Sequence, residues 1–293
     1  MYDISSIYRA SSVAGAVAAL ERDPAAVVIA GGTDVLIKVR EGKLSGASLV
    51  SIHGLTGELS GVEALENGDL SIGALTTFRG VTRDPLIRAR VPVLGEAADT
   101  AGGPQLRAVG TIGGNVCNGV TSADTASTLM ALDAQLHVRG SAGWRVVPIG
   151  QWYRGVGRVA LEHAELLCRI VIPRESWEGW SGHYIKYAQR SAMDIATLGV
   201  SCLVKLSPDK AACEDVRLAF GVAAPTPIRA RAAEDGVRGL PVREAAEKIG
   251  TLALADVNPR TSWRASREYR LQLVQELSGR ALLEAARKGG AQV

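Results

Sequence analysis

The chain contains 293 residues, of which 47% are hydrophobic and 4% aromatic, and its formal net charge is +3. These values exclude a disordered chain and predict a well-buried globular protein with room for two domains. The small charge and the scarcity of aromatic residues argue against a nucleic-acid or membrane partner.

No targeting or metal-binding pattern stands out along the chain. The N-terminus lacks the basic and apolar regions of a signal peptide, and no apolar stretch approaches the ~20 residues of a membrane-spanning helix. The four histidines show no metal-ligand spacing, and neither do the four cysteines, which are Cys117, Cys168, Cys202 and Cys213. We therefore expect a cytoplasmic protein with reduced thiols and no metal or iron–sulfur cluster of its own.

The first part of the chain is predicted to mix short strands and short helices. Apolar residues at helical spacing indicate a helix over 12–20, with Ser11 or Ser12 as its N-cap. The stretch "AAVVIAGG" predicts a buried strand that runs directly into two glycines. Further strands are expected over 47–52, 69–75 and 164–173, helices over 76–87 (cut short by Asp84-Pro85), 93–100 and 122–132, and a β-hairpin over 134–149.

A domain boundary is expected in "RESWEGWSG", residues 174–182, which has glycines, charges and two tryptophans but no hydrophobic period. We divide the chain there into residues 1–175 and 176–293. Short mixed strands followed by helices favour two α+β domains over one doubly wound sheet. Beyond the boundary, strands are expected near 183–188, 195–206 and 214–223, and helices over 242–257 and 266–288.

Two glycine-rich turns are the most informative local features: "AGGTDVL" at 30–36 and "GTIGGNVCNG" at 110–119. Paired glycines let a ligand approach the main chain, and the backbone N–H groups of such turns form a concave site for phosphate oxygens. Neither turn has G-x-G-x-x-G or P-loop spacing. Tight turns between strands remain the alternative interpretation. Taken together, the pair predicts two loops that close on one diphosphate.

The segments "VIAGGTDVLIKVR" and "LRAVGTIGGNVCNGVTSADTASTLMALDA" resemble the FAD-binding subunits of molybdenum hydroxylases. That family includes xanthine dehydrogenases, carbon monoxide dehydrogenase and 4-hydroxybenzoyl-CoA reductase. The resemblance extends over essentially the whole chain, through "KYAQRSAMDIATLGV" and "RLAFGVAAPTPIRA", and it is strongest to the stand-alone FAD subunit of bacterial three-subunit xanthine dehydrogenases. A cysteine-bearing insert that holds a [4Fe–4S] cluster in some relatives is missing, which argues against the acyl-CoA reductase branch.

The resemblance implies a fold and a set of cofactor contacts. Residues 1–175 would form a two-subdomain FAD-binding domain of the vanillyl-alcohol-oxidase-like (PCMH-type) class, and 176–293 a smaller α+β C-terminal flavoprotein domain. No side chain is expected to act as a nucleophile or a general acid. The implied FAD-binding residues are Ile29, Ala30, Gly31, Gly32, Thr33, Asp34, Val35, Leu36, Ala101, Thr111, Ile112, Gly113, Gly114, Asn115, Asp124, Leu167, Lys186 and Ile195.

Several of these positions also have a simpler interpretation. Asp124 would contact the cofactor or merely cap a helix, and Lys186 would lie near the isoalloxazine ring or at a solvated strand end. Leu167 would line the flavin or belong to the core. Ala101 is assigned to the adenine side of the cofactor and Ile195 to packing over the ring.

The resemblance also implies a function. A molybdopterin centre in a large partner subunit would oxidise the substrate, most naturally xanthine or another purine. Electrons would cross two [2Fe–2S] clusters of a small subunit, reach FAD on this chain and leave to NAD⁺ or O₂. The alternatives are the FAD subunit of a sister hydroxylase acting on CO, nicotinate or another aromatic heterocycle, and a non-redox nucleotide-binding module.

Overall fold

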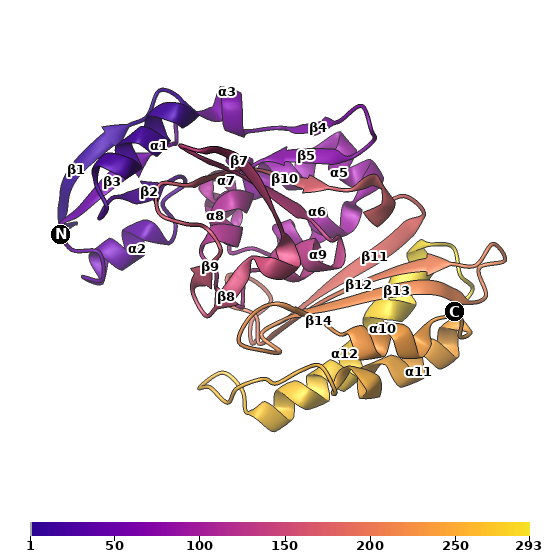
Figure 1. Ribbon diagram of the computed structural model, residues 1–293. Helices are drawn as coiled ribbons and strands as arrows, with labels where there is room; N and C mark the ends of the chain where they lie inside the picture. The colour runs from indigo at the N-terminus through magenta and orange to yellow at the C-terminus, as the bar shows by residue number, and fades with distance from the viewer. Residues whose placement is uncertain (1) are drawn as a thin grey trace.

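The computed structural model describes residues 2–293 and begins with a small parallel sheet. Its strand order is β1-β3-β2, and the helices α1 and α2 connect the strands (Figure 1). The Ser12 hydroxyl accepts a hydrogen bond from Gly15 N at 3.0 Å, which confirms Ser12 as the N-cap of α1. The bounds are β1 (Ile4–Arg9), α1 (Val13–Arg22), β2 (Val27–Ile29), α2 (Val35–Arg40) and β3 (Ala47–Ser51).

A five-stranded antiparallel sheet follows, in the order β4-β5-β10-β6-β7. The predicted hairpin at 134–149 is confirmed as β6 and β7. The central strand β10 is buried at every position except Arg169, because both of its neighbours and the helices cover it. The bounds are α3 (Thr56–Leu59), β4 (Val62–Ala64), β5 (Leu70–Gly73), β6 (Gln135–Gly140), β7 (Gly143–Pro148) and β10 (Leu166–Ile172).

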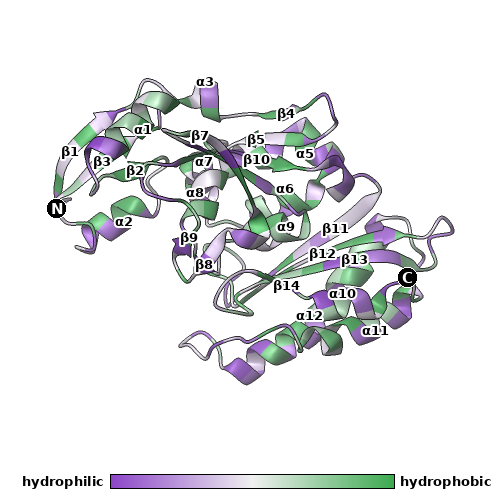
Figure 2. Ribbon diagram, viewed as in Figure 1, coloured by the Kyte–Doolittle hydropathy of each residue, from purple (hydrophilic) through white to green (hydrophobic). Residues whose placement is uncertain are grey.

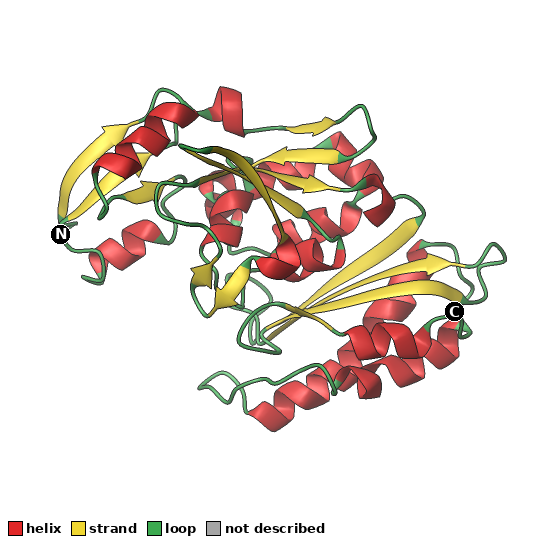
Figure 3. Ribbon diagram, viewed as in Figure 1, coloured by secondary structure: helices red, strands yellow, loops and turns green. Residues whose placement is uncertain are grey.

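Short helices, α4 to α9, pack beside this sheet (Figure 3). The predicted helix over 76–87 is divided in two, because Asp84 ends the first helix and accepts hydrogen bonds from Leu86 N and Ile87 N at the start of the second. The bounds are α4 (Phe78–Arg83), α5 (Pro85–Arg90), α6 (Pro92–Asp99), α7 (Pro104–Val109), α8 (Ile112–Cys117) and α9 (Ala126–Ala131). The short pieces η1 (Ile149–Gln151), β8 (Tyr153–Gly155), β9 (Arg158–Val159) and η2 (Arg174–Ser176) complete this part of the chain.

The C-terminal part is a four-stranded antiparallel sheet in the order β11-β12-β13-β14, with three helices on one face (Figure 1). Hydrophilic and hydrophobic residues alternate around these helices of the C-terminal part, as Figure 2 shows. Helices α6 and α9 of the first part pack against the sheet, so β12 is covered on both faces. The bounds are β11 (Trp180–Tyr187), β12 (Leu198–Leu206), β13 (Cys213–Gly221), β14 (Ile228–Arg229), α10 (Arg231–Val237), α11 (Val242–Ala253) and α12 (Arg267–Lys288).

The two-part α+β organisation therefore agrees with the expected fold class. Some local expectations differ: β11 already begins at Trp180, inside the segment expected to be irregular, and the helix expected over 242–257 ends at Ala253. Over residues 2–293, none of the helices combines the length and the apolar character needed to cross a membrane.

Candidate functional site

The two glycine-rich turns lie against each other although about eighty residues separate them. A Cβ added to Gly31 would lie only 1.9 Å from the Val109 carbonyl oxygen, so the backbones are in direct contact there. Lys38 Nζ on α2 donates to Asn118 Oδ1 at 3.0 Å, just after α8. The fold therefore brings the two turns into one place, as the sequence predicted.

The first turn presents unpaired backbone donors. Gly32 has φ +73°, a conformation suited to glycine, and it turns the chain from β2 into α2. None of the backbone N–H groups of residues 31–35 has an acceptor within residues 2–293, and the first amide used is that of Leu36, which bonds Gly32 O at 3.0 Å. Successive free N–H groups in such a turn attract anions, phosphate oxygens included.

The second turn contributes mainly space, because the N–H of Thr111 is its one amide among residues 110–115 with no acceptor within residues 2–293. It forms the first turn of α8, and Thr111 caps this helix by accepting a hydrogen bond from Gly114 N at 3.0 Å. Ile112 N and Gly113 N are bonded to backbone carbonyls at 3.0 and 2.9 Å. The expectation that both turns present free amides is therefore wrong for residues 112–115 of the second turn. A Cβ on Gly114 would approach only Thr111 Oγ, at 3.0 Å, so this glycine faces otherwise open space.

Asp124 and Lys186 form an ion pair between the two parts of the chain. Asp124 precedes α9 and Lys186 lies on β11, and Lys186 Nζ is 3.0 Å from Asp124 Oδ1. The same Nζ donates to Thr100 O at 2.9 Å, and the Tyr184 hydroxyl donates to Asp124 Oδ1 at 3.4 Å. Only 9% of the lysine and 12% of the aspartate side chain are exposed. Asp124 is thus not the N-cap of α9, a position held by Thr125, and Lys186 is not a solvated strand end.

Burial dominates the protonation of Asp124. Its pKa is raised to about 6 because desolvation disfavours the carboxylate, an effect that Lys186 and the Tyr184 hydroxyl only partly offset. Burial also raises the pKa of Tyr184 well above its usual value, with Asp124 adding to the effect. The pair is therefore a group whose charge changes near neutral pH.

Four other predicted positions differ in burial and in contacts. Ala101 is buried directly after Thr100, whose carbonyl binds Lys186. Leu167 is 3% exposed within the main core, as its simpler interpretation had it. Ile195 is 48% exposed in the loop between β11 and β12. Asn115 Oδ1 accepts a hydrogen bond from the Thr125 hydroxyl at 2.6 Å and so ties α8 to α9.

The remaining positions cluster at the first turn. Ile29 ends β2, Ala30 follows it, and Val35 and Leu36 form the first turn of α2. Thr33 and Asp34 occupy the turn between them, and the Asp34 side chain makes no capping hydrogen bond. These positions surround the free N–H groups.

A pocket of about 290 Å³ adjoins Thr111 and Val109. Thr111 is the single sequence-predicted site residue in its lining, so sequence reasoning missed the others. They come from three separate segments that no local motif connects: His53, Thr56, Ser60, Gly61, Val62, Leu75, Thr76, Thr77, Gly80, Asp84, Ala108 and Val109.

The thiols have no evident role in this site. Burial raises the pKa of Cys117 to about 12 and that of Cys168 to about 11, so both stay protonated and unreactive at neutral pH. Within residues 2–293 no group of three or more His, Cys, Asp or Glu side chains is arranged to hold a metal ion.

Comparison with known families agrees with this architecture. The family described as the FAD binding domain in molybdopterin dehydrogenase matches residues 2–175, and the CO dehydrogenase flavoprotein C-terminal domain matches residues 183–285. The chain therefore belongs to the FAD-binding subunits of the molybdenum hydroxylase family.

Individual relatives cover the chain almost completely. The xanthine dehydrogenase FAD-binding subunit of Escherichia coli O157:H7 is 42% identical over 99% of this chain and 99% of its own. The glyceraldehyde dehydrogenase medium chain of Sulfolobus acidocaldarius is 30% identical over 96% and 98%. The structure of carbon monoxide dehydrogenase from Hydrogenophaga pseudoflava matches with a TM-score of 0.91 and 28% identity, over 99% of both chains.

Proposed function

We propose that this chain is the electron-transfer subunit of a xanthine dehydrogenase. It would take electrons from [2Fe–2S] clusters of a small partner subunit, downstream of a molybdopterin-bearing large subunit, and pass them to NAD⁺ or O₂. One observation carries the substrate assignment. Identity is 42% to a subunit named for xanthine dehydrogenase, but 29–31% to relatives named for glyceraldehyde, nicotinate and carbon monoxide.

The residues of the site suit FAD. The free N–H groups of residues 31–35 would donate to the diphosphate, and Gly114 would leave it room. The pocket lined by Thr111 adjoins the start of the second turn and offers space for a further part of the nucleotide. When bound, FAD supplies a redox centre that accepts electrons singly and releases them in pairs as hydride.

The pair of Lys186 and Asp124 would set the charge beside the cofactor. Lys186 Nζ supplies a buried positive charge, which favours negative charge on a neighbouring group. An Asp124 carboxyl oxygen can take up a proton near neutral pH, because its pKa is about 6. The net charge of the pair can therefore adjust without movement of either side chain.

FAD titration of the purified chain tests the site. We expect one FAD per chain, and Lys186→Met should weaken its binding and shift the visible flavin bands. Lys205→Met is the matched control, because Lys205 lies on the same sheet, pairs with Glu214 at 3.2 Å, and is opposite Trp180, six residues along β11 from Lys186. Equal effects of the two substitutions, or none, would contradict the proposed site.

Gly114→Leu provides a steric test. The added side chain would enter the open space beside Thr111, so FAD uptake should be lost while the far-ultraviolet circular dichroism stays unchanged. Normal flavin content in this variant would count against the assignment. Binding of ADP without FAD would favour the non-redox alternative.

The partner and substrate assignments need the assembled complex. Mass spectrometry of copurifying subunits, followed by turnover assays with xanthine, nicotinate and carbon monoxide, each with NAD⁺ or O₂ as acceptor, should show xanthine oxidation coupled to NAD⁺ reduction. Turnover of one of the other substrates alone would assign the chain to a sister hydroxylase.

A further inference from the structure

Helix α9 lies between two acidic residues that both bind the C-terminal sheet. Asp124 lies two residues before the helix and Asp133 two residues after it. All six residues of α9 are buried, and so are Thr125 and Leu132 on either side. A segment packed this tightly moves as a unit, because close-packed interiors leave no room for its parts to shift separately.

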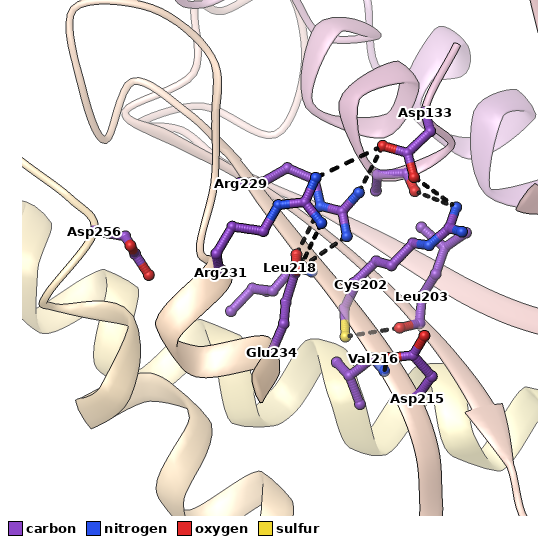
Figure 4. Close-up of polar contacts among 12 residues, drawn as sticks. Asp133, Cys202, Leu203, Asp215, Val216, Leu218, Arg229, Arg231, Glu234 and Asp256 are labelled. Carbon is purple, nitrogen blue, oxygen red and sulfur yellow. Dashed lines mark hydrogen bonds and ion pairs between the residues drawn. The ribbon is translucent and has the colours of Figure 1, made fainter. Parts of the chain in front are cut away.

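Asp133 is the centre of an ionic cluster between the two parts of the chain (Figure 4). Arg229 Nη1 donates to Asp133 Oδ1 at 2.7 Å, and Arg217 Nη1 lies 3.2 Å from Asp133 Oδ2. The same Arg217 nitrogen donates to Ala131 O, the last residue of α9, at 3.2 Å. Arg217 also stacks on Trp180 with its guanidinium 4.4 Å from the ring centroid. The end of α9 is therefore held by side chains of β13 and β14.

Arg229, which binds Asp133 in this cluster, is itself held in place by Glu234. Arg229 is 7% and Glu234 2% exposed, and two hydrogen bonds of 2.7 and 2.8 Å join them side by side. Glu234 Oε1 also accepts from Leu218 N at 2.9 Å. A planar guanidinium paired in this way has one orientation, so its remaining nitrogen is directed at Asp133.

The two carboxylates bind opposite edges of one sheet. Lys186, the partner of Asp124, is on the edge strand β11, and Arg229, the partner of Asp133, is on the edge strand β14. Three strand spacings separate these edges, roughly 14 Å. Asp124 and Asp133 are nine residues apart along the chain, and the six helical residues of α9 together with the non-helical residues on either side are long enough to reach across this distance. Helix α9 therefore crosses the sheet, packing on β12, β13 and β14.

We propose that Asp133 is a positioning residue for the Asp124–Lys186 pair. Its bonds to Arg229 and Arg217 hold the far end of α9 on the sheet, and the rigid helix then sets the distance between Asp124 and Lys186 at the near end. Asp133 touches neither member of that pair, so it acts on the FAD site through the helix. The proposal rests on the proposed function for its FAD readout, but its titration readout needs no cofactor.

Asp133→Asn is the test variant. Asparagine has the same shape and tolerates the positive φ of residue 133, +46°, so it removes the charge without straining the backbone. The Asp133 side chain is 41% exposed, which limits the cost to folding. Asp215→Asn is the matched control, because Asp215 also pairs with an arginine, Arg238 at 3.2 Å, but within the C-terminal part alone. Asp133→Glu keeps the charge and should restore part of any loss.

Two measurements separate positioning from simple destabilisation. Carbon-13 NMR titration measures the pKa of the Asp124 carboxyl in the FAD-free chain, and this pKa depends on how close Lys186 lies. In Asp133→Asn the pKa should rise by about 0.5 or more, because Asp124 stays buried while its cation moves away. FAD binding should weaken by about tenfold, a usual cost of losing a residue that orients a ligand-binding group. Asp215→Asn should change neither value.

The outcomes are distinct. If the Asp124 titration in Asp133→Asn matches that of the wild type, or if Asp215→Asn alters it equally, the positioning role is refuted. If the unaltered chain takes up no FAD but the titration shifts as expected, the proposed function fails and the positioning role stands. A shift that Asp133→Glu fails to restore even in part would show that charge at this position is not the cause, and would also overturn the proposal.

Discussion

At the scale of single residues, Asp124 shows how burial converts an ordinary carboxyl into a group that responds near neutral pH. Its folded-state pKa of about 6 exceeds the usual 3.8. Between those two values the folded chain binds more protons than the unfolded chain. The contribution of Asp124 to stability is therefore largest below pH 3.8 and is lost as the pH rises to about 6, a change of at most ~3 kcal/mol.

Asp124→Asn should remove this pH dependence. We expect the free energy of unfolding of the variant to increase relative to that of the wild type as the pH rises from 4 to 6.5. Above pH 6.5 the difference between the two should stay constant. A cost of the substitution that does not depend on pH, such as lost packing beside Lys186, does not affect this change with pH. Urea denaturation of the FAD-free proteins at several pH values measures it, and parallel curves would refute the expected protonation of Asp124.

Gly31 and Gly114 should differ sharply in their tolerance of a methyl group. Gly31→Ala would place its Cβ 1.9 Å from a backbone oxygen, so we expect a loss of about 2 kcal/mol or more. Gly114→Ala meets only the Thr111 hydroxyl and gains helix propensity, so stability should change by less than about 1 kcal/mol. Urea midpoints of the FAD-free variants test this contrast, and similar losses for both would contradict the observed packing of the turns.

At the scale of elements, α8 shows that a ligand-binding motif can also be a structural one. Its first amides are satisfied by Thr111, Thr76 and Ala74, so this turn is complete without a cofactor. The first turn is incomplete, since the amides of residues 31–35 have no acceptor within the described chain. The two turns should therefore respond differently to FAD.

Thr111→Val should destabilise the FAD-free chain by about 1 kcal/mol, because it removes the N-cap of α8 while keeping the side-chain shape. Thr111→Ser keeps the capping oxygen and should lose little. Thermal unfolding of both variants without FAD provides the measurement. A Thr111→Val protein as stable as wild type would contradict a stabilising role of the Thr111 cap.

At the scale of the whole molecule, the two parts share a core. Leu203 on β12 and Ala219 on β13 belong to the same buried cluster as Leu129 of α9, whereas Val200 and Val204 face the C-terminal helices. Separating the parts would expose the face of the sheet that α6 and α9 cover. We therefore expect the two parts of the chain, residues 1–175 and 176–293, to be stable only together.

We expect the FAD-free chain to unfold in one transition. Urea curves followed by far-ultraviolet circular dichroism and by tryptophan fluorescence should coincide, because both signals report on both parts: Trp152 is buried in the first, and Trp180 begins β11 of the second. Two separate transitions would indicate that the contacts across α9 contribute little to stability.

Local features of the chain were predictable from the sequence alone. The Ser12 cap, the β6–β7 hairpin and the break at Asp84-Pro85 depend on a few neighbouring residues. Steric allowance and capping act over three or four positions, so a pattern reveals them. The two glycine pairs predicted loops that close on one diphosphate, and the family resemblance assigned that diphosphate to FAD.

Tertiary structure decided the rest. Strand β1 has mostly exposed residues and no apolar alternation, and it exists because β3 supplies a parallel partner some forty residues later. The assignment of free amides to the first turn and satisfied amides to the second depends on Thr76 and Ala74, which no motif connects to α8. Burial and hydrogen-bond partners are set by segments distant in sequence. For that reason only the folded chain shows Asp124 paired with Lys186, and α9 held at both ends on one sheet.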